Sequence, residues 1–239
     1  MLQNINAFYG AQLGATDGDI GHVKDFYFDD KTWAIRYLVA DTGSWLTGRQ
    51  VLLSPHAFAP GIFSTFDPAT RTMATILTRQ QIEASPSIDA HRPVSRQQEI
   101  QYYSYFGWPA YWQDFGIGVV AGIPAVKLPP VSGASLHHGH NQRDDLHLCS
   151  MKAVTSYHIE ATDGRIGTVS SFMVHGHSWA IHEVMVETGH WYAGKPILLL
   201  PENITRISHD DSTLFVNLAK VDFALTAKND IAQAGAGSH

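Results

Sequence analysis

Histidine is the first residue type in this 239-residue sequence that could do chemistry, because eleven of its fourteen histidines lie from position 137 onward. Three of them, His137, His138 and His140, fall within four residues in a segment rich in glycine and serine. Imidazole binds zinc, but a structural zinc site takes three or four ligands held by ordered elements, and this run has no second scaffolded pair. These histidines are therefore a weak candidate metal site, and the alternative is a solvated, low-complexity linker.

Aromatic residues form a second group, because eight of the fourteen residues from 102 to 115 are Tyr, Phe or Trp. Tyr and Trp provide rigid contact area and are enriched at interface hot spots. One interpretation is an exposed docking patch, and the other is a segment that fills the seam between two halves of the molecule. Dimerisation would satisfy both, whereas base stacking would need surrounding Arg and Lys, which are sparse here. The candidate protein-docking residues are Tyr105, Phe106, Trp108, Tyr111 and Trp112.

The remaining titratable residues do not form a catalytic pattern. Asp17 and Asp163 each precede a glycine at a predicted turn, and Asp41 matches Glu187 at a predicted strand end. The lone cysteine, Cys149, has no basic cluster beside it that would activate the thiol. The sequence also lacks a Gly-x-Ser-x-Gly motif, a Gly-rich phosphate loop and a His-Glu-x-x-His motif. We therefore expect no catalytic residues, no enzymatic activity and no cofactor.

An internal repeat organises the elements that carry these residues. The stretch from 15 to 55 aligns without a gap to the stretch from 161 to 201 at an offset of 146, with eighteen identities in 41 positions. The shared residues include the Ala-Thr-Asp-Gly run at the start, a Trp-Ala-Ile run and a Thr-Gly-x-Trp run. So many matches indicate a duplication.

Each copy predicts several short strands followed by a short helix. Asp-Gly at 17–18 and 163–164 predicts a hairpin with a type I′ turn, and Gly21 and Gly167 predict a bulge or a close backbone approach. Strands are expected to about 28 and 174, over 33–39 and 179–186, and at 51–53 and 197–199. A last pair is expected near 62–66 with 73–77 and near 204–208 with 214–218.

The closing helix has a clear signal only in the first copy. Thr78 with Gln81 forms a capping box for a helix that ends near Ser85-Pro86. The second copy keeps the apolar residues Val221 and Phe223 but has Ala219 at the cap position. Short strands followed by one helix favour a small closed or nearly closed barrel, which hides its own edges.

Composition and charge restrict the classes of partner. An apolar content of 44% with 16% charged residues is typical of a globular protein. The net charge is −6, and neither half has the basic excess that nucleic-acid binding requires, so we expect no nucleic-acid partner. One cysteine, no signal-peptide pattern and no run of 18 apolar residues predict a cytoplasmic protein without membrane insertion. Peripheral association with a membrane complex stays open.

The repeated pattern A-T-D-G-x-I-G-x-V, then W-A-I, T-G-x-W and an L-L-x-P step, resembles the PRC-barrel, most closely its two-copy bacterial members. The stretches 85–89, 93–99 and 105–112 also resemble the segment after the first barrel in those proteins. PRC-barrels are similar to the cytoplasmic domain of the photosynthetic reaction-centre H subunit and to the C-terminal domain of ribosome maturation factors. In both, the resemblance implies a protein-docking module without chemistry of its own.

We therefore expect a mainly β protein with two small PRC-type β-barrels in tandem, each with one short helix. The predicted domains are a first barrel at 1–90, an aromatic and then Gly/Pro/His-rich linker at 91–149, and a second barrel at 150–239. The expected function is a non-enzymatic interaction or assembly scaffold, a homodimer that presents a surface to a protein partner. The alternative is a metal- or small-ligand-binding protein that uses the histidine-rich linker and the second barrel.

Overall fold

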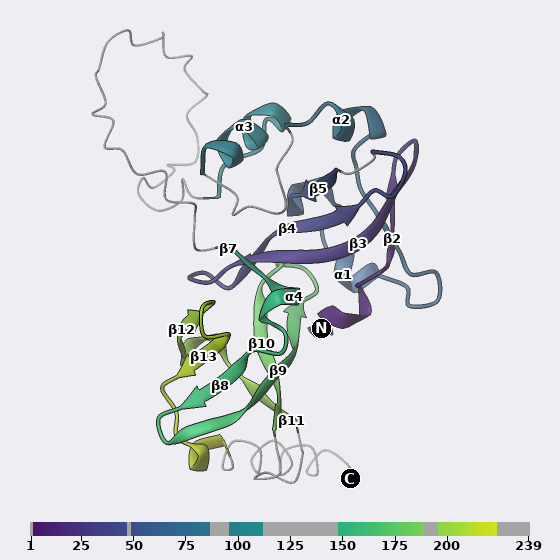
Figure 1. Ribbon diagram of the computed structural model, residues 1–239. Helices are drawn as coiled ribbons and strands as arrows, with labels where there is room; N and C mark the ends of the chain where they lie inside the picture. The colour runs from purple at the N-terminus through teal and green to yellow at the C-terminus, as the bar shows by residue number, and fades with distance from the viewer. Residues whose placement is uncertain (1, 47–48, 87–95, 112–147, 189–195, 224–239) are drawn as a thin grey trace, which may run out of the picture.

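The computed structural model describes residues 2–46, 49–86, 96–111, 148–188 and 196–223. It is mainly β, and each repeat forms a sheet of its own (Figure 1). The first sheet has the strand order β5-β4-β3-β2-β6, and the second has the order β11-β10-β9-β8-β13-β12. Both are antiparallel except at β2–β6 and β8–β13, which are parallel. Within the described residues the strand pairing does not close either sheet, so closure into two barrels stays a prediction.

The elements of the first repeat lie between the N-terminus and Phe106. They are β1 (Leu2–Asn4), η1 (Ile5–Ala7), β2 (Gln12–Ala15), β3 (Gly18–Asp29), β4 (Ala34–Asp41), β5 (Gln50–Leu53), η2 (Pro55–Ala57), α1 (Ile62–Thr65), β6 (Thr72–Ala74), α2 (Arg79–Glu83) and α3 (Arg96–Phe106).

The elements of the second repeat begin at Leu148. They are β7 (Leu148–Ser150), α4 (Met151–Val154), β8 (His158–Ala161), β9 (Gly164–His175), β10 (Ile181–Thr188), β11 (Pro196–Leu199), η4 (Pro201–Asn203), β12 (Ile204–Ser208) and β13 (Thr213–Val216).

The two repeats exchange their first strands. β1, at the N-terminus, pairs with β9 of the second repeat, and β7 pairs with β3 of the first, as the green strand against the purple one in Figure 1. The registers are equivalent at the sequence offset of 146: Asn4 lies opposite Met173, and Ser150 lies opposite Tyr27. Each repeat therefore completes the sheet of the other, in the manner of a twofold dimer within one chain.

The repeats also contact each other directly, at the approximate twofold axis that relates them. Ala34 forms an antiparallel bridge with its own counterpart, Ala180. The Ile35 amide donates to the Trp179 carbonyl, and the Ile181 amide donates to the Trp33 carbonyl, both at 2.8 Å. Trp33 and Trp179 have positive φ values of 52° and 56°, which bulky residues seldom adopt. The unusual backbone thus occurs at equivalent positions of both copies, directly before the bridge between Ala34 and Ala180.

One continuous hydrophobic core joins the two sheets. Its residues come from both repeats and include Phe28 and Phe172, which are both fully buried and whose ring centroids are 5.7 Å apart. One face of each sheet enters this core: in β10 the buried residues alternate with less buried ones from Val184 to Thr188, whereas β4 buries both faces, with Leu38 and Ala40 in this core. The other, outer face of each sheet points away from it.

Several expectations from the sequence are confirmed. The Thr78 capping box is present and begins α2. A Cβ at Gly21 or Gly167 would lie 2.0 or 2.2 Å from the carbonyl oxygen of Asp41 or Glu187, so both glycines permit a close backbone approach. Ala219 occupies the cap position of the second copy, where its amide donates to Asp222 at 2.9 Å.

Two local expectations are wrong. Residues 62–65 form the helix α1 and not a strand, because Ile62 and Phe63 point together into the core after a left-handed Gly61. The hairpin at Asp17-Gly18 forms, but its central residues are Thr16 and Asp17, and neither has the positive φ of a type I′ turn. Asp17 instead accepts a hydrogen bond from the first amide of α2, at Arg79 (2.7 Å).

A buried carboxylate fixes the exchanged strand β7. Asp25 of β3 accepts hydrogen bonds from the Ser150 hydroxyl and from the Lys152 amide, the latter at 3.0 Å. At the equivalent junction the roles are reversed, since the Ser171 hydroxyl of β9 donates to Asn4 of β1 at 2.6 Å. Burial raises the pKa of Asp25 above the ordinary aspartate value of 3.8, although these hydrogen bonds oppose the shift.

Because the core is shared, we expect the two repeats to unfold in one transition. Phe28→Leu and Phe172→Leu should each lower the free energy of unfolding by about 1–2 kcal/mol. Together they should show a coupling energy of about 0.5–1.5 kcal/mol, because each removes the same ring contact. Urea denaturation followed by circular dichroism measures all three variants. Phe172→Leu combined with Ile82→Val in α2 is the control pair, and the losses of unfolding free energy in these two variants should add. Two separate unfolding transitions would contradict the shared core.

The raised pKa of Asp25 predicts a pH dependence of stability. Between about pH 3.8, where the unfolded carboxyl titrates, and the higher folded pKa, the folded protein binds more protons than the unfolded chain. The stability contributed by this group is therefore complete below pH 3.8 and is lost as the pH rises through the folded pKa. Asp25→Asn does not titrate, so the stability of the wild type relative to this variant should fall across that window. Urea titrations at several pH values test this, with the exposed Asp19→Asn as control; a constant difference would contradict it.

Candidate functional site

The aromatic segment singled out from the sequence forms α3 and the turn after it, and it covers the outer face of the first sheet (Figure 1). Tyr102 and Tyr103 are almost fully buried and pack with Tyr37, Val39 and Leu52 in a second, smaller hydrophobic cluster. The Tyr102 hydroxyl donates to the Leu52 carbonyl at 2.6 Å. The described part of the segment therefore packs on one sheet, and the seam between the repeats is filled by the shared core instead.

Glu99 is the polar centre of this cluster. Its side chain is fully buried, and Oε1 accepts hydrogen bonds from the Tyr37 hydroxyl at 2.7 Å and the Tyr111 hydroxyl at 2.8 Å. The guanidinium of Arg36 lies 3.8 Å from the centre of the Tyr111 ring. Burial, and then the charge of Glu99, raise the pKa of Tyr37 well above its usual value, so that this phenol stays a donor.

The predicted docking residues differ in how far they are exposed. The Tyr105 side chain is 43% exposed, and its hydroxyl donates to the Gln81 carbonyl at 3.2 Å. Phe106 and Trp108 stack on each other with ring centroids 4.3 Å apart and are half-buried, as is Tyr111. Trp112 lies outside the described residues. A docking role for this set stays a prediction, and Tyr105 is its most exposed described member.

The equivalent outer face of the second sheet has a different character. Leu198 and Leu200, the counterparts of Leu52 and Ser54, are 44% and 40% exposed. Glu183 stands where the first sheet has Tyr37, and half-buried methionines take the places of Tyr27 and Val39, at Met173 and Met185. We call the set Met173, Glu183, Met185, Leu198 and Leu200 the second outer face. It combines exposed leucines with soft, adaptable methionines, which are typical of binding surfaces.

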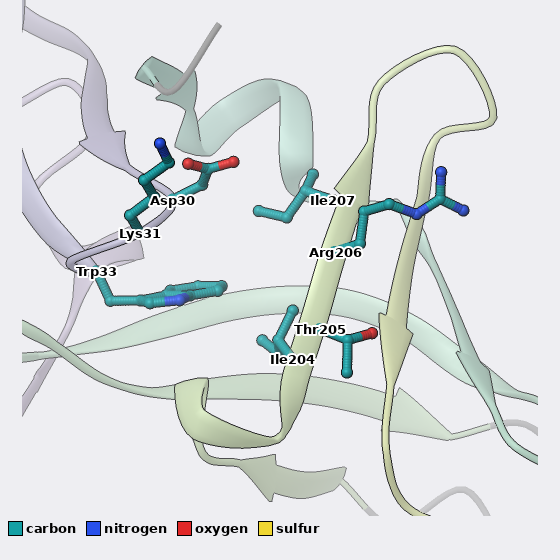
Figure 2. Close-up of a pocket in the computed structure, with 7 residues that line it drawn as sticks. All are labelled: Asp30, Lys31, Trp33, Ile204, Thr205, Arg206 and Ile207. Carbon is teal, nitrogen blue, oxygen red and sulfur yellow. The ribbon is translucent and has the colours of Figure 1, made fainter.

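A pocket of about 230 Å³ lies between the repeats, beside the axis. Figure 2 shows the indole of Trp33 facing β12, whose Ile204 and Ile207 side chains form the opposite wall. The Asp30 carboxylate lies above the indole, whereas the Arg206 side chain points away and packs over the Phe215 ring at 4.2 Å. The sequence alone did not indicate this site, because its walls come from residues more than 170 positions apart in the chain.

Cys149 lies beside His209, a neighbour that its sequence context did not predict. Its thiol lies 3.4 Å from Nε2 of His209, whose Nδ1 is 3.2 Å from the Tyr157 hydroxyl. This geometry resembles a nucleophile with its base. However, burial, and then the charges of Asp30 and Asp29, raise the pKa of Cys149 to about 12. The thiol is therefore protonated at neutral pH, which disfavours a nucleophilic role.

The candidate metal ligands His137, His138 and His140 lie outside the described residues. In the part of the chain that the structure describes, no three His, Cys, Asp or Glu side chains come together as a metal site would require. His175 and His177 lie together at the β9–β10 turn, with ring centroids 6.0 Å apart, and His177 is within 3.3 Å of the Ser64 hydroxyl. His177 thus contacts the other repeat.

Comparison of the sequence with models of known protein families, and with curated proteins, finds no match. The resemblance to PRC-barrels therefore rests only on the sequence motifs, which are the repeated pattern and the stretches 85–89, 93–99 and 105–112. None of the helices that the structure describes combines the length and the apolar character needed to cross a membrane. The candidate sites are thus two surfaces defined by geometry, the second outer face and the Trp33 pocket.

The Glu99 cluster predicts which aromatic residues hold α3 on the first sheet. Tyr37→Phe removes a donor from a buried carboxylate, so it should lower the free energy of unfolding by about 1–3 kcal/mol. Tyr105→Phe is the matched control, since it removes an exposed phenol and should change stability by at most about 0.5 kcal/mol. Urea denaturation compares the two. Equal and small losses would show that the Glu99 hydrogen bonds do not hold the helix.

Proposed function

We propose that this protein is a non-enzymatic interaction scaffold, and that its second outer face binds an amphipathic helix of a protein partner. One observation carries the proposal: the same face of the duplicated sheet is covered by α3 in the first repeat but exposes Leu198 and Leu200 in the second. The first repeat thus provides a template for the kind of element that packs against this backbone. A helix with an apolar and aromatic stripe fits that template.

The charge of Glu183 on the second outer face restricts which residues the partner helix can place against it. In the first repeat, Glu99 of α3 meets the Tyr37 hydroxyl, so the carboxylate belongs to the helix. In the second repeat the sheet itself provides the carboxylate at that position, as Glu183. The partner helix should therefore present a basic residue or a hydroxyl where α3 presents Glu99, because a second carboxylate there would repel the first.

The resemblance to PRC-barrel modules agrees with a docking role. Two PRC-type barrels, a homodimer, a cytoplasmic location and peripheral contact with a membrane complex stay predictions from the sequence. The aromatic residues around Tyr105 are an alternative docking site for the partner. The raised pKa of Cys149 also favours binding over catalysis, since it weakens the one arrangement of described side chains that resembles a catalytic pair.

Site-specific photo-crosslinking in the native host tests the proposal. A photoreactive amino acid replaces Leu198 in the full chain, and the crosslinked peptides are identified by mass spectrometry. We expect one other protein, crosslinked through a helix with an apolar stripe and a basic residue. Glu183→Lys in the same chain should lower the crosslink yield about tenfold, because it sets like charges against each other.

The control is the same photoreactive residue at Ile76, which is 57% exposed but lies on the first repeat. It should not give the partner crosslink. Crosslinks from position 198 only to residues 224–239 of the same chain, or only to a second copy, would overturn the proposal. So would a partner that is captured from Tyr105 and not from position 198, because docking would then belong to the aromatic segment.

A further inference from the structure

The helix α3 of the first repeat shows in detail how a helix is held on this sheet. Glu99, Tyr102 and Tyr103 are almost fully buried against the sheet. They are three and four residues apart, which places them on one side of a helix. We number these places along the helix 1, 4 and 5. The contact that each of them makes shows what the equivalent sheet of the second repeat can accept.

Position 4 of the helix is held through the backbone of the sheet. The Tyr102 hydroxyl donates to the Leu52 carbonyl at 2.6 Å and accepts from the Ser54 amide at 3.4 Å. β5 is the last strand of the first sheet, and an edge strand leaves backbone groups without a partner in its own sheet. One tyrosine hydroxyl thus meets two backbone groups at this edge.

The second repeat has the same backbone at the equivalent place. β11 is likewise the last strand of its sheet, and its register on β10 equals that of β5 on β4 at the sequence offset of 146. The Leu198 carbonyl and the Leu200 amide are therefore directed in the same way as the two groups that meet Tyr102. Among the described residues, no hydrogen bond outside the strand pairing reaches either of them.

Position 5 of the helix meets a different group in the two repeats. The Tyr103 hydroxyl lies 3.2 Å from the hydroxyl of Ser54, which is fully buried. In the second repeat Leu200 replaces this serine, and its side chain is 40% exposed. A phenol hydroxyl covered at that place would have no side-chain partner, which costs free energy, whereas an aliphatic side chain would bury the leucine.

We propose that the partner helix of the second outer face carries a tyrosine at position 4 and an aliphatic residue at position 5. The tyrosine hydroxyl bonds to the Leu198 carbonyl and the Leu200 amide, and the aliphatic residue covers the Leu200 side chain. This inference rests on the proposed function and adds to it the residues by which the partner is recognised. The tyrosine contact is made to backbone groups, which the two copies share although their side chains differ.

A helical peptide tests the proposal. It copies residues 96–108 with Glu99→Lys at position 1 and Tyr103→Leu at position 5. A lactam bridge joins the places of Ile100 and Ser104, whose side chains are exposed in α3, and circular dichroism checks that the peptide is helical.

Nuclear magnetic resonance titration of the full chain locates and measures the binding, with the methionine methyl groups labelled. We expect the Met173 and Met185 signals to shift with a dissociation constant on the order of 10 µM. The signals of Met73 and Met151, which are fully buried in the shared core, should not shift.

The tyrosine hydroxyl at position 4 is the first variable. Tyr102→Phe in the peptide should weaken binding about tenfold, because both backbone groups would then be covered without a partner. Tyr105→Phe is the matched control, since it removes a hydroxyl from the exposed side of the helix, and it should change the dissociation constant by less than about twofold.

The second variable is the residue at position 5, which is tested from the side of the protein. Leu200→Ser restores the serine of the first repeat on an exposed site, so the variant should fold. This variant should bind the peptide that keeps Tyr103 about fivefold more tightly than the peptide with Tyr103→Leu. The wild-type protein should show the opposite order.

The outcomes separate this inference from the proposed function. If no peptide shifts the Met173 and Met185 signals at about 20-fold above about 10 µM, both are overturned. If these signals shift but Tyr102→Phe does not weaken binding, the recognition by tyrosine is overturned and helix docking on this face stands. If Leu200→Ser leaves the order of the two peptides unchanged, the aliphatic contact at position 5 is overturned.

Discussion

The antiparallel crossing of the two repeats at Ala34 and Ala180 is the contact on which the rest of the structure depends. Two backbone hydrogen bonds of 2.8 Å, between each repeat's isoleucine and the other's tryptophan, join the starts of β4 and β10. The neighbours of these two strands, β3 and β9, each accept the first strand of the other repeat. An edge strand exposes unpaired backbone groups, and the exchange of β1 and β7 satisfies part of that demand within one chain. Because each sheet needs a strand from the other repeat, neither repeat contains all of its own sheet. The shared core, with Phe28 against Phe172, is the consequence in side-chain packing.

Around this common backbone the side chains of the two copies have diverged, and the candidate sites lie where they differ. The strand-exchange junction keeps its geometry although Asp25 with Ser150 in one copy corresponds to Ser171 with Asn4 in the other. Elsewhere the change is larger: α1 fills the space beside Trp179, and β12 leaves space beside Trp33. The outer faces differ in the same way, since α3 covers Leu52 whereas Leu198 is exposed. The duplicated fold thus shows, in one copy, the occupants that the other copy lacks in its described residues.

The buried polar groups of the first repeat have structural roles that account for their environments. Glu99 is a carboxylate inside an aromatic cluster, and two tyrosine hydroxyls meet it, which offsets the cost of its burial. Asp25 has a raised pKa because burial outweighs three hydrogen bonds, and two of these bonds, from Ser150 and Lys152, hold β7 and the start of α4 in place. Cys149 is protonated for the same reason, since it lies in an apolar environment with two aspartates nearby. For both Asp25 and Cys149, burial is the largest cause of the raised pKa.

The sequence by itself determined the elements that depend on local patterns or on the duplication. The offset of 146 located the equivalent strands, the capping box at Thr78 located α2, and Gly21 and Gly167 indicated close backbone contacts. Residues 62–65 were predicted as a strand because a short apolar run fits either state, whereas in the structure they form a helix that buries Ile62 and packs Phe63 against Trp179. The aromatic content of α3 was evident from sequence, but the face it covers was not, since that depends on contacts between residues about 50 positions apart. The tertiary structure alone decided the strand exchange, the exposed second outer face and the Trp33 pocket, because each arises from the relative placement of the two repeats, which no local pattern encodes.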